Sequence, residues 1–285
     1  MSHPLLQTLA DDVRRALEED IGAGDVTADL IPEDTQANAT LITRVPMVLC
    51  GRPHAEEVFG QLDPKVTIAW QGNEGDAFEA NSVIAHFEGP ARSLLSGERT
   101  ALNFLQCLSA VATITRRLSA LLDDTRAGLY DTRKTLPGLR YAQKYAVSVG
   151  GGQNHRIGLF DQVLIKENHI AAAGSLTQAV KQARHHHPSI RVQVEVETPS
   201  EFEEALACRP DIIMLDNFDS DALAHAVKRR DQLGLTGIEL EASGGITEAN
   251  LRVIGLTGVD RISLGTLTKD ISAIDLSMRV ELSQK

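Results

Sequence analysis

From about residue 126 onward, short apolar runs alternate with helical patterns, and this alternation most constrains the fold of the 285-residue chain. Strands joined by helices over short connections form a parallel sheet with crossover helices. Six such strands in about 140 residues favour a closed β/α barrel. An open doubly wound sheet stays possible, but its usual Gly-rich nucleotide signature does not follow the first strand. The runs are AGLYD, QVLIKEN, IRVQVEVET, DIIMLDN, GIELEASGG and VDRISLGT; helical segments such as SLTQAVKQARHHH and PSEFEEALAC separate them.

The first 90 or so residues predict a small α+β unit. Residues 5–21 carry leucines and other apolar residues at helical spacing, which predicts an amphipathic helix. The segments ATLITRVPMVLCG, VTIAW and VIAHFEG are rich in β-branched residues and predict strands. Residues 98–122 predict one long, mostly apolar helix that is buried in a core or a subunit interface.

Composition limits the partners. The net charge of -11 argues against nucleic acid or an anionic membrane as a partner of the whole chain. The three cysteines show no C-x-x-C spacing, no basic and apolar leader opens the chain, and no apolar run reaches membrane-spanning length. We therefore expect a soluble cytoplasmic protein, and any anion site must come from a local concentration of cations.

Polar residues stand where nearly every predicted barrel strand ends, which is where a β/α barrel builds its site. Burying charge inside a barrel is costly unless the charge is paired or liganded, so the repeated placement is the strongest functional signal. The strand-end residues are Asp131, Thr132, Arg133, Lys134, Lys166, Glu167, Asn168, His169, Glu195, Glu197, Asp216, Asn217, Glu239, Glu241, Ser243, Ser263 and Gly265.

The charges also segregate along the chain. Arg133, Lys134, His155, Arg156 and Lys166 come from the first two strands and the loop between them, and the acidic Glu195 and Asp216 follow. A cationic half facing an acidic half suits a polyanionic substrate carried with a divalent metal. The histidines 185–187 end a helix before a proline, and we interpret them as a solvated helix terminus.

Seven segments in order closely resemble the quinolinate phosphoribosyltransferase family, also called nicotinate-nucleotide pyrophosphorylase (carboxylating). They are DTRKTLPGLR, GGGQNHRIGL, LIKENHI, VEVET, IIMLDNF, EASGGI and SLGTLTKDI, and GERTALNFLQ and EDIGAGDVT also match. The resemblance implies an N-terminal α/β open sandwich domain over 1–112, completed by 268–285, and an irregular β/α barrel over 113–267. It also implies a homodimer whose sites lie at the interface.

The resemblance implies a role for each matched residue. Arg133, His155, Arg156 and Lys166 would hold the two carboxylates of quinolinate, joined by Arg99 of the neighbouring subunit. Lys134 would contact the diphosphate, and Glu195 and Asp216 would serve the ribose hydroxyls and Mg²⁺, directly or through water. The residues implied to bind substrate as well are Thr132 and, for the 5′-phosphate, Ser243, Gly244, Gly245, Ser263, Leu264 and Gly265.

The implied reaction transfers phosphoribose from phosphoribosyl diphosphate to quinolinate, with loss of carbon dioxide. The residues agree, because a planar dianion needs a cationic cage and no Ser-His-Asp or reactive Cys arrangement is present. Three alternatives stay open: a Schiff-base enzyme using Lys166, a phosphoribosyltransferase for another heterocycle, and a sensor of phosphorylated metabolites. The pair Glu195 and Asp216 argues against the sensor, because an anion binder gains nothing from carboxylates.

Overall fold

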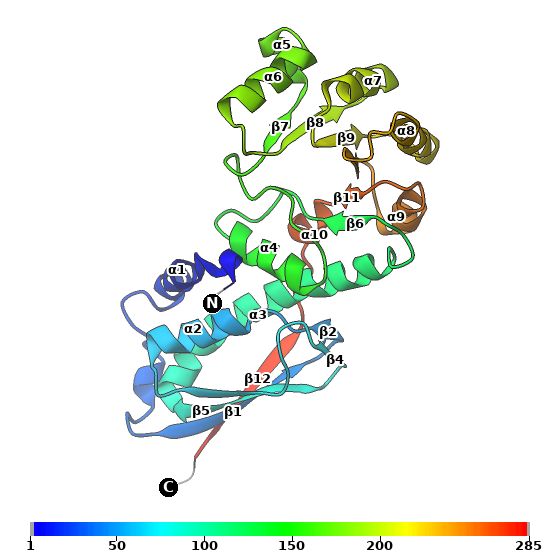
Figure 1. Ribbon diagram of the computed structural model, residues 1–285. Coiled ribbons are helices and arrows are strands. Elements are labelled where there is room, and N and C mark those ends of the chain that lie inside the picture. The colour runs from blue at the N-terminus through cyan, green and yellow to red at the C-terminus, as the bar shows by residue number, and fades with distance from the viewer. Residues whose placement is uncertain (1–2, 284–285) are drawn as a thin grey trace. The chain divides into compact units, whose positions relative to one another are not determined.

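The computed structural model describes residues 3–283, which form two compact units (Figure 1). The first unit takes the chain up to Arg116, then Thr135–Gly151 and the chain from Thr266 onward. The second takes Arg117–Lys134 and Gly152–Gly265. The division into domains 1–112 and 113–267, with 268–285 completing the first, stays our proposal for the domain boundaries.

The first unit is built on an antiparallel sheet of four strands in the order β12-β1-β5-β3. Alternate residues of β1 are buried, so one face of the strand packs on the core, as its apolar alternation requires. The C-terminal strand β12 pairs along the length of β1, from Ala37 opposite Leu282 to Thr43 opposite Leu276. The strands are β1 (Gln36–Thr43), β3 (Thr67–Trp70), β5 (Val83–Pro90) and β12 (Leu276–Leu282), with a separate pair β2 (Met47–Val48) and β4 (Ala77–Phe78).

Helices α2 and the first part of α3 lie on one side of this sheet (Figure 1). Phe59 of α2 packs on Phe87 of β5 with their ring centroids 5.5 Å apart. Gly97 of α3 lets the helix approach, because a Cβ there would lie 2.6 Å from the Phe59 ring. The helical segments of this unit are η1 (Pro4–Leu6), α1 (Leu9–Ile21), η2 (Ala28–Leu30), α2 (Arg52–Leu62), α3 (Ala91–Ala120, which ends in the second unit), α4 (Arg140–Val149) and α10 (Thr266–Lys269).

Two of these helices match predictions and two were missed. The predicted helices over 5–21 and 98–122 are confirmed as α1 and α3, although α1 begins at Leu9 and α3 already at Ala91. Helix α4 was not predicted. Its residues 142–147 are all buried, the polar Gln143 and Lys144 among them, so polar residues do not mark an exposed face there. Helix α2 was missed as well, since it begins directly after the left-handed Gly51 inside a Gly- and Pro-rich stretch.

The second unit is a parallel sheet of six strands in the order β6-β11-β10-β9-β8-β7, which confirms all six predicted strands. The end strands β6 and β7 do not pair with each other within the described residues, so the barrel is irregular. The strands are β6 (Gly128–Tyr130), β7 (Val163–Ile165), β8 (Val192–Val196), β9 (Ile212–Asp216), β10 (Glu239–Ser243) and β11 (Arg261–Ser263). The helices are α5 (Glu167–Ala173), α6 (Leu176–His186), α7 (Pro199–Cys208), α8 (Ser220–Gln232) and α9 (Glu248–Gly255).

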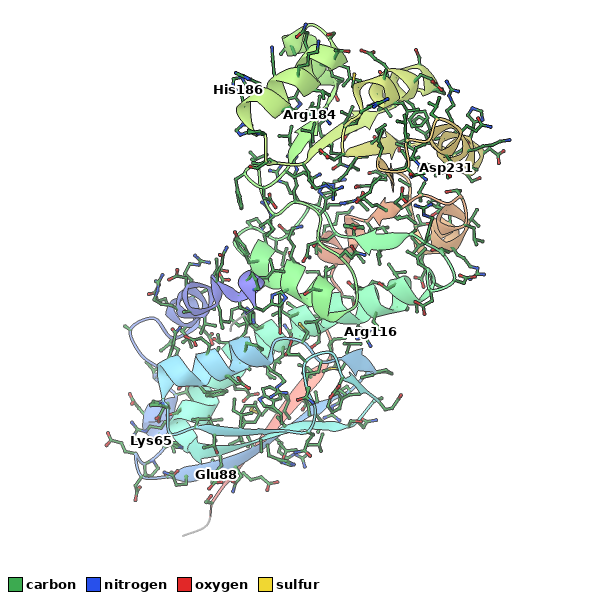
Figure 2. The ribbon with its side chains drawn as sticks, in the orientation of Figure 1. Lys65, Glu88, Arg116, Arg184, His186 and Asp231 are labelled. Atoms are coloured by element: carbon green, nitrogen blue, oxygen red, sulfur yellow. The ribbon has the colours of Figure 1, made fainter. Side chains whose placement is uncertain are left out.

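Side-chain caps explain where the crossover helices begin. The hydroxyl of Ser175 accepts from the backbone N–H of Gln178 at α6, and Asp219 accepts from that of Ala222 at α8. Thr198 and Glu201 form a reciprocal capping box at α7. Histidines 185–187 are exposed at the end of α6, as predicted, and Figure 2 shows His186 at the outer surface of the second unit.

Within the described residues, no helix combines the length and the apolarity that crossing a bilayer requires.

Buried His54 should make the first unit sensitive to acid. Its side chain is 1% exposed and stacks on Phe104, and burial lowers the pKa of His54 from 6.5 to about 4. Between these values the unfolded chain binds a proton that the folded chain does not. Stability is therefore full above pH 6.5 and falls by about 3 kcal/mol as the pH drops toward 4.

His54→Leu should flatten this dependence. Thermal unfolding midpoints measured from pH 7 to pH 4.5 should fall less in the variant than in the unmodified protein. His86→Gln, at an exposed histidine of the same unit, is the control and should keep the original slope. Equal slopes for His54→Leu and the unmodified protein would show that another group titrates.

Candidate active site

The carboxyl ends of the six parallel strands enclose a cavity of about 290 Å³. Every strand of the second unit, or the residues directly following it, contributes to its wall. The lining residues are Thr132, Arg133, Lys134, His155, Arg156, Leu164, Lys166, Glu195, Met214, Asp216, Ser243 and Ser263. Ten of these twelve are residues that the sequence placed in the site, and only the apolar Leu164 and Met214 were not named.

The strand register explains why these side chains meet. Glu195 of β8 and Glu241 of β10 both lie opposite Met214 of β9, and Glu241 lies opposite Arg261 of β11. Residues two apart on a strand share a face, so Met214 and Asp216 both reach the cavity. Parallel strands in this register therefore bring residues distant in sequence to one edge of the sheet.

Cations gather on the wall contributed by β6, β7 and the loop between them. Burial, and then the neighbouring guanidinium of Arg133, lower the pKa of Arg156. Lys166 is the N-cap residue of α5, and its backbone N–H donates to Nδ1 of His169 at 3.1 Å. Because two guanidinium groups lie so close together, this wall is suited to binding an anion.

Carboxylates face the cations from β8 and β9. Oε2 of Glu195 lies 2.5 Å from Nζ of Lys166, and Oδ2 of Asp216 accepts from the side chain of Asn217 at 3.0 Å. Oxygens of Glu195, Glu167 and Glu197 lie within 4.8 Å of one another. Such hard oxygen donors suit Mg²⁺. The structure thus brings Glu195 and Asp216 into one cavity, and their predicted role as metal ligands stays a prediction.

Glycines shape the turn that follows β10. Gly244 has a φ of 82° and Gly245 a φ of 60°, values that favour glycine. A Cβ on Gly244 would lie 2.2 Å from Oδ1 of Asn217, whereas one on Gly245 would meet nothing within 4 Å. Gly244 and Gly245 follow Ser243, and Leu264 and Gly265 follow Ser263. The two serines line the cavity, and the residues that follow them do not.

Arg99 is another predicted site residue that does not line the cavity, and unlike the residues of the turns it does not adjoin it in the chain. It is exposed on α3 and belongs to the first unit. Its contact with the site of a neighbouring subunit stays a prediction.

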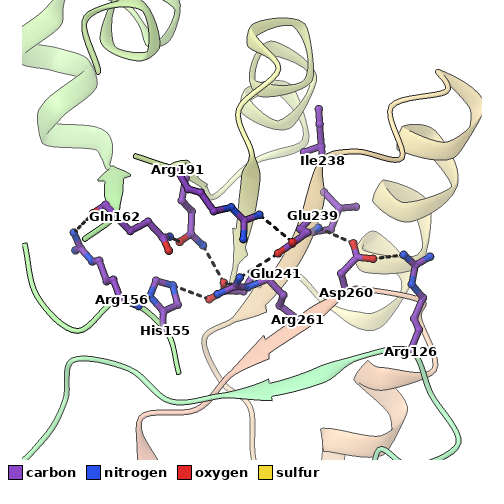
Figure 3. A network of polar contacts seen from close by, with 12 residues as sticks. Arg126, His155, Arg156, Gln162, Arg191, Ile238, Glu239, Glu241, Asp260 and Arg261 are labelled. Atoms are coloured by element: carbon purple, nitrogen blue, oxygen red, sulfur yellow. Dashed lines mark hydrogen bonds and ion pairs between the residues drawn. The ribbon is translucent and has the colours of Figure 1, made fainter. Parts of the chain in front are cut away.

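A buried polar layer beneath the cavity was missed by the site prediction (Figure 3). Glu241 is 0% exposed, and its Oε2 accepts from Nε of Arg261 at 2.9 Å and from Nε2 of Gln193 at 3.0 Å. Gln193 in turn accepts from Gln162 at 2.5 Å. Burial opposes the charge of Glu241, but His155 and Arg261 outweigh it and lower the pKa of Glu241, so the carboxylate is ionised at neutral pH.

One signal in the sequence could have found this layer. Glu239 and Glu241 are two apart on a strand and were recognised as sharing a face, and Arg261 contacts both.

Asp131 was named as a strand-end residue without a role. It is fully buried, and its carboxylate accepts from the side chain of Asn154 at 2.7 Å and from the backbone N–H of His155 at 2.8 Å.

A parallel β/α barrel with a cavity of opposed charges at its strand ends defines an enzyme that acts on an anionic substrate. Two family models match the chain: quinolinate phosphoribosyl transferase, N-terminal domain, over residues 25–109, and the C-terminal domain over residues 111–279. The chain belongs to the quinolinate phosphoribosyltransferase family.

Relatives from distant organisms agree with this membership. The chain is 43% identical over 268 residues to the probable nicotinate-nucleotide pyrophosphorylase (carboxylating) of Bacillus subtilis (strain 168), covering 94% of this chain and 91% of that protein. It is 35% identical over 297 residues to quinolinate phosphoribosyltransferase (decarboxylating) 2b, mitochondrial, of Nicotiana tabacum, covering 98% and 84%. The solved nicotinate-nucleotide pyrophosphorylase from Francisella tularensis matches with a TM-score of 0.92 and 45% identity over 98% of each chain.

The two glycines after β10 should respond differently to alanine. In Gly244→Ala the new methyl group collides with the side chain and backbone N of Asn217, whereas Gly245→Ala bears only the cost of its left-handed backbone, about 1 kcal/mol. We expect Gly244→Ala to lose about 2 kcal/mol more stability than Gly245→Ala in thermal unfolding. Equal losses would contradict the close approach of Asn217.

Proposed function

We propose that the cavity at the strand ends of the second unit carries out the reaction of this family. That reaction transfers phosphoribose from phosphoribosyl diphosphate to quinolinate with loss of carbon dioxide, giving nicotinate mononucleotide and diphosphate for NAD synthesis. The observation that carries the proposal is the cavity itself, in which Arg133, Arg156 and Lys166 face Glu195 and Asp216.

Quinolinate would bind on the cationic wall. Its two carboxylates are matched by Arg133, Arg156 and Lys166, with His155 beside them. The pyridine nitrogen is already a nucleophile, so the wall need only orient it toward the ribose. Decarboxylation would follow on the pyridinium adduct, whose positive nitrogen accepts the electrons.

Phosphoribosyl diphosphate would bind next to quinolinate in the same cavity. Lys134 would contact the diphosphate, with Thr132 nearby, and the turns after β10 and β11 would hold the 5′-phosphate with hydroxyls and backbone N–H groups. As diphosphate leaves, the ribose gains positive charge, which Glu195 and Asp216 would stabilise.

Mg²⁺ is the cofactor we propose, held by Glu195 and Asp216 directly or through water. When bound, it would neutralise negative charge on the departing diphosphate. Lys166 contacts Glu195, so a carboxylate of quinolinate that pairs with Lys166 would release Glu195 for the ribose and the metal.

The assembly and its location are proposals as well. A homodimer in which Arg99 reaches the neighbouring site would explain an exposed arginine near the start of the long helix α3. A cytoplasmic location fits the absence of cysteine pairing among the described residues, where all three cysteines are free.

A direct assay tests the function. Purified protein is mixed with phosphoribosyl diphosphate, Mg²⁺ and either quinolinate or nicotinate, and nicotinate mononucleotide and carbon dioxide are followed. We expect turnover of quinolinate alone, because the cation count fits two carboxylates. Turnover of nicotinate instead would assign the cavity to a related phosphoribosyltransferase. Borohydride trapping of Lys166 with a carbonyl substrate would instead support a Schiff-base enzyme.

Arg133→Ala should weaken the binding of quinolinate but not that of phosphoribosyl diphosphate. Loss of the charge-assisted contacts should weaken quinolinate binding about 100-fold or more, while binding of phosphoribosyl diphosphate changes little. Isothermal titration with each substrate measures both affinities. Arg229→Ala is the control, because this residue lies outside the cavity and pairs with Glu203 at the surface, so it should leave both affinities unchanged. Equal losses for both substrates in Arg133→Ala would contradict its role.

A further inference from the structure

His155 is held at the cavity wall by buried partners. Its side chain is 6% exposed, and its backbone N–H donates to Oδ1 of Asp131 at 2.8 Å. The other oxygen of Asp131 accepts from the side chain of Asn154, so the carboxylate is hydrogen-bonded to two successive residues of the loop. The place of the imidazole ring in the wall is therefore set from inside the protein.

The contacts of the ring define where its proton lies. Nδ1 of His155 accepts from the backbone N–H of Arg156 at 2.8 Å. A ring nitrogen that accepts carries no proton, so the proton of the imidazole is on Nε2. Nε2 lies 3.4 Å from Oε1 of Glu241, as the dashed line in Figure 3 shows. The ring N–H thus faces a buried carboxylate.

Glu241 cannot turn away from this contact. Its Oε2 accepts from both Arg261 and Gln193, which leaves Oε1 for the imidazole. Arg261 is itself fixed, because it also donates to Glu239 at 3.1 Å and stacks 3.8 Å over the ring of Tyr130. Glu241 does not line the cavity, so it can act on a ligand only through partners that do, which are His155 and Ser263, and of these His155 adjoins the cationic wall.

We propose that Glu241 is a positioning residue that fixes the tautomer and orientation of His155, and through His155 the backbone of the quinolinate-binding Arg156. The inference rests on the proposed function for the identity of the ligand. The charged groups around His155 come from several segments: Asp131 after β6, the neighbouring Arg156 and Glu241 of β10 contact it, and Arg261 of β11 contacts Glu241 in turn. His155 then lines the cavity in one orientation, beside the arginines and the lysine that bind the carboxylates of quinolinate.

Glu241→Gln tests this with almost no change of shape. Arg261 and Gln193 both donate to the Oε2 position, so the amide oxygen must take that place and its NH₂ group must face His155. A donor would then meet a donor, the ring proton would move to Nδ1, and the bond from the Arg156 N–H would break. We expect the KM for quinolinate to rise about tenfold, with the KM for phosphoribosyl diphosphate within about twofold of the original.

Glu239→Gln is the matched control. It alters another glutamate that binds Arg261, on the same strand and face, but Glu239 contacts Arg191 rather than His155. Its KM for quinolinate should stay within about twofold of the original. Equal increases in both variants would show that the layer only stabilises the barrel and would overturn the proposal.

Nitrogen-15 NMR of the histidine rings tests the proposal without turnover. The signal of His155 is assigned by its loss in His155→Gln. In the unmodified protein and in Glu239→Gln it should show a protonated Nε2 and a bare Nδ1, and in Glu241→Gln the reverse. A proton on Nδ1 in the unmodified protein would overturn the proposal. The expected tautomer in a protein that does not turn over quinolinate would support the positioning of His155 and reject the proposed function.

Discussion

The buried carboxylate of Glu241 is the charge around which the interior of the second unit is arranged. An ion inside a protein costs several kcal/mol unless it is paired and hydrogen-bonded. Here Arg261, Gln193 and His155 surround it from three other parts of the barrel. Losing Arg261 would leave the buried charge unpaired, and losing Gln193 would remove a hydrogen bond to it, so each contact helps to hold Glu241 in place beneath the cavity.

The cavity also explains how an acidic chain can bind anions. The net charge is -11, yet Arg133, Lys134, Arg156 and Lys166 converge on one wall. Gly265 makes room for this, because a Cβ there would lie 2.8 Å from Cδ of Lys134. Cations held close together repel one another, and a dianionic ligand relieves that repulsion. Adjacent Arg133 and Lys134 are thus consistent with a site where two anionic substrates meet.

Prediction from the sequence succeeded where the pattern is local. The six strands of the barrel alternate with capped helices, and Thr198 with Glu201 is a start signal that can be read directly. Prediction failed where polar residues are buried together with apolar ones, as in the middle of α4. The pairing of β12 with β1 joins segments more than 230 residues apart, and no local signal specifies such a partner.

The sequence by itself determined the repeated strands, the polar residues at their ends and membership of the family. Periodicity and the order of motifs are properties of the chain alone, so they can be recognised before the fold is known. Only the tertiary structure decided which of those residues share a wall. Register across β8 to β11 placed Glu241 opposite Arg261 and beneath His155, contacts that depend on strand order rather than on spacing along the chain. It also separated Glu241, which is buried and acts through another residue, from Glu195, which faces the cavity.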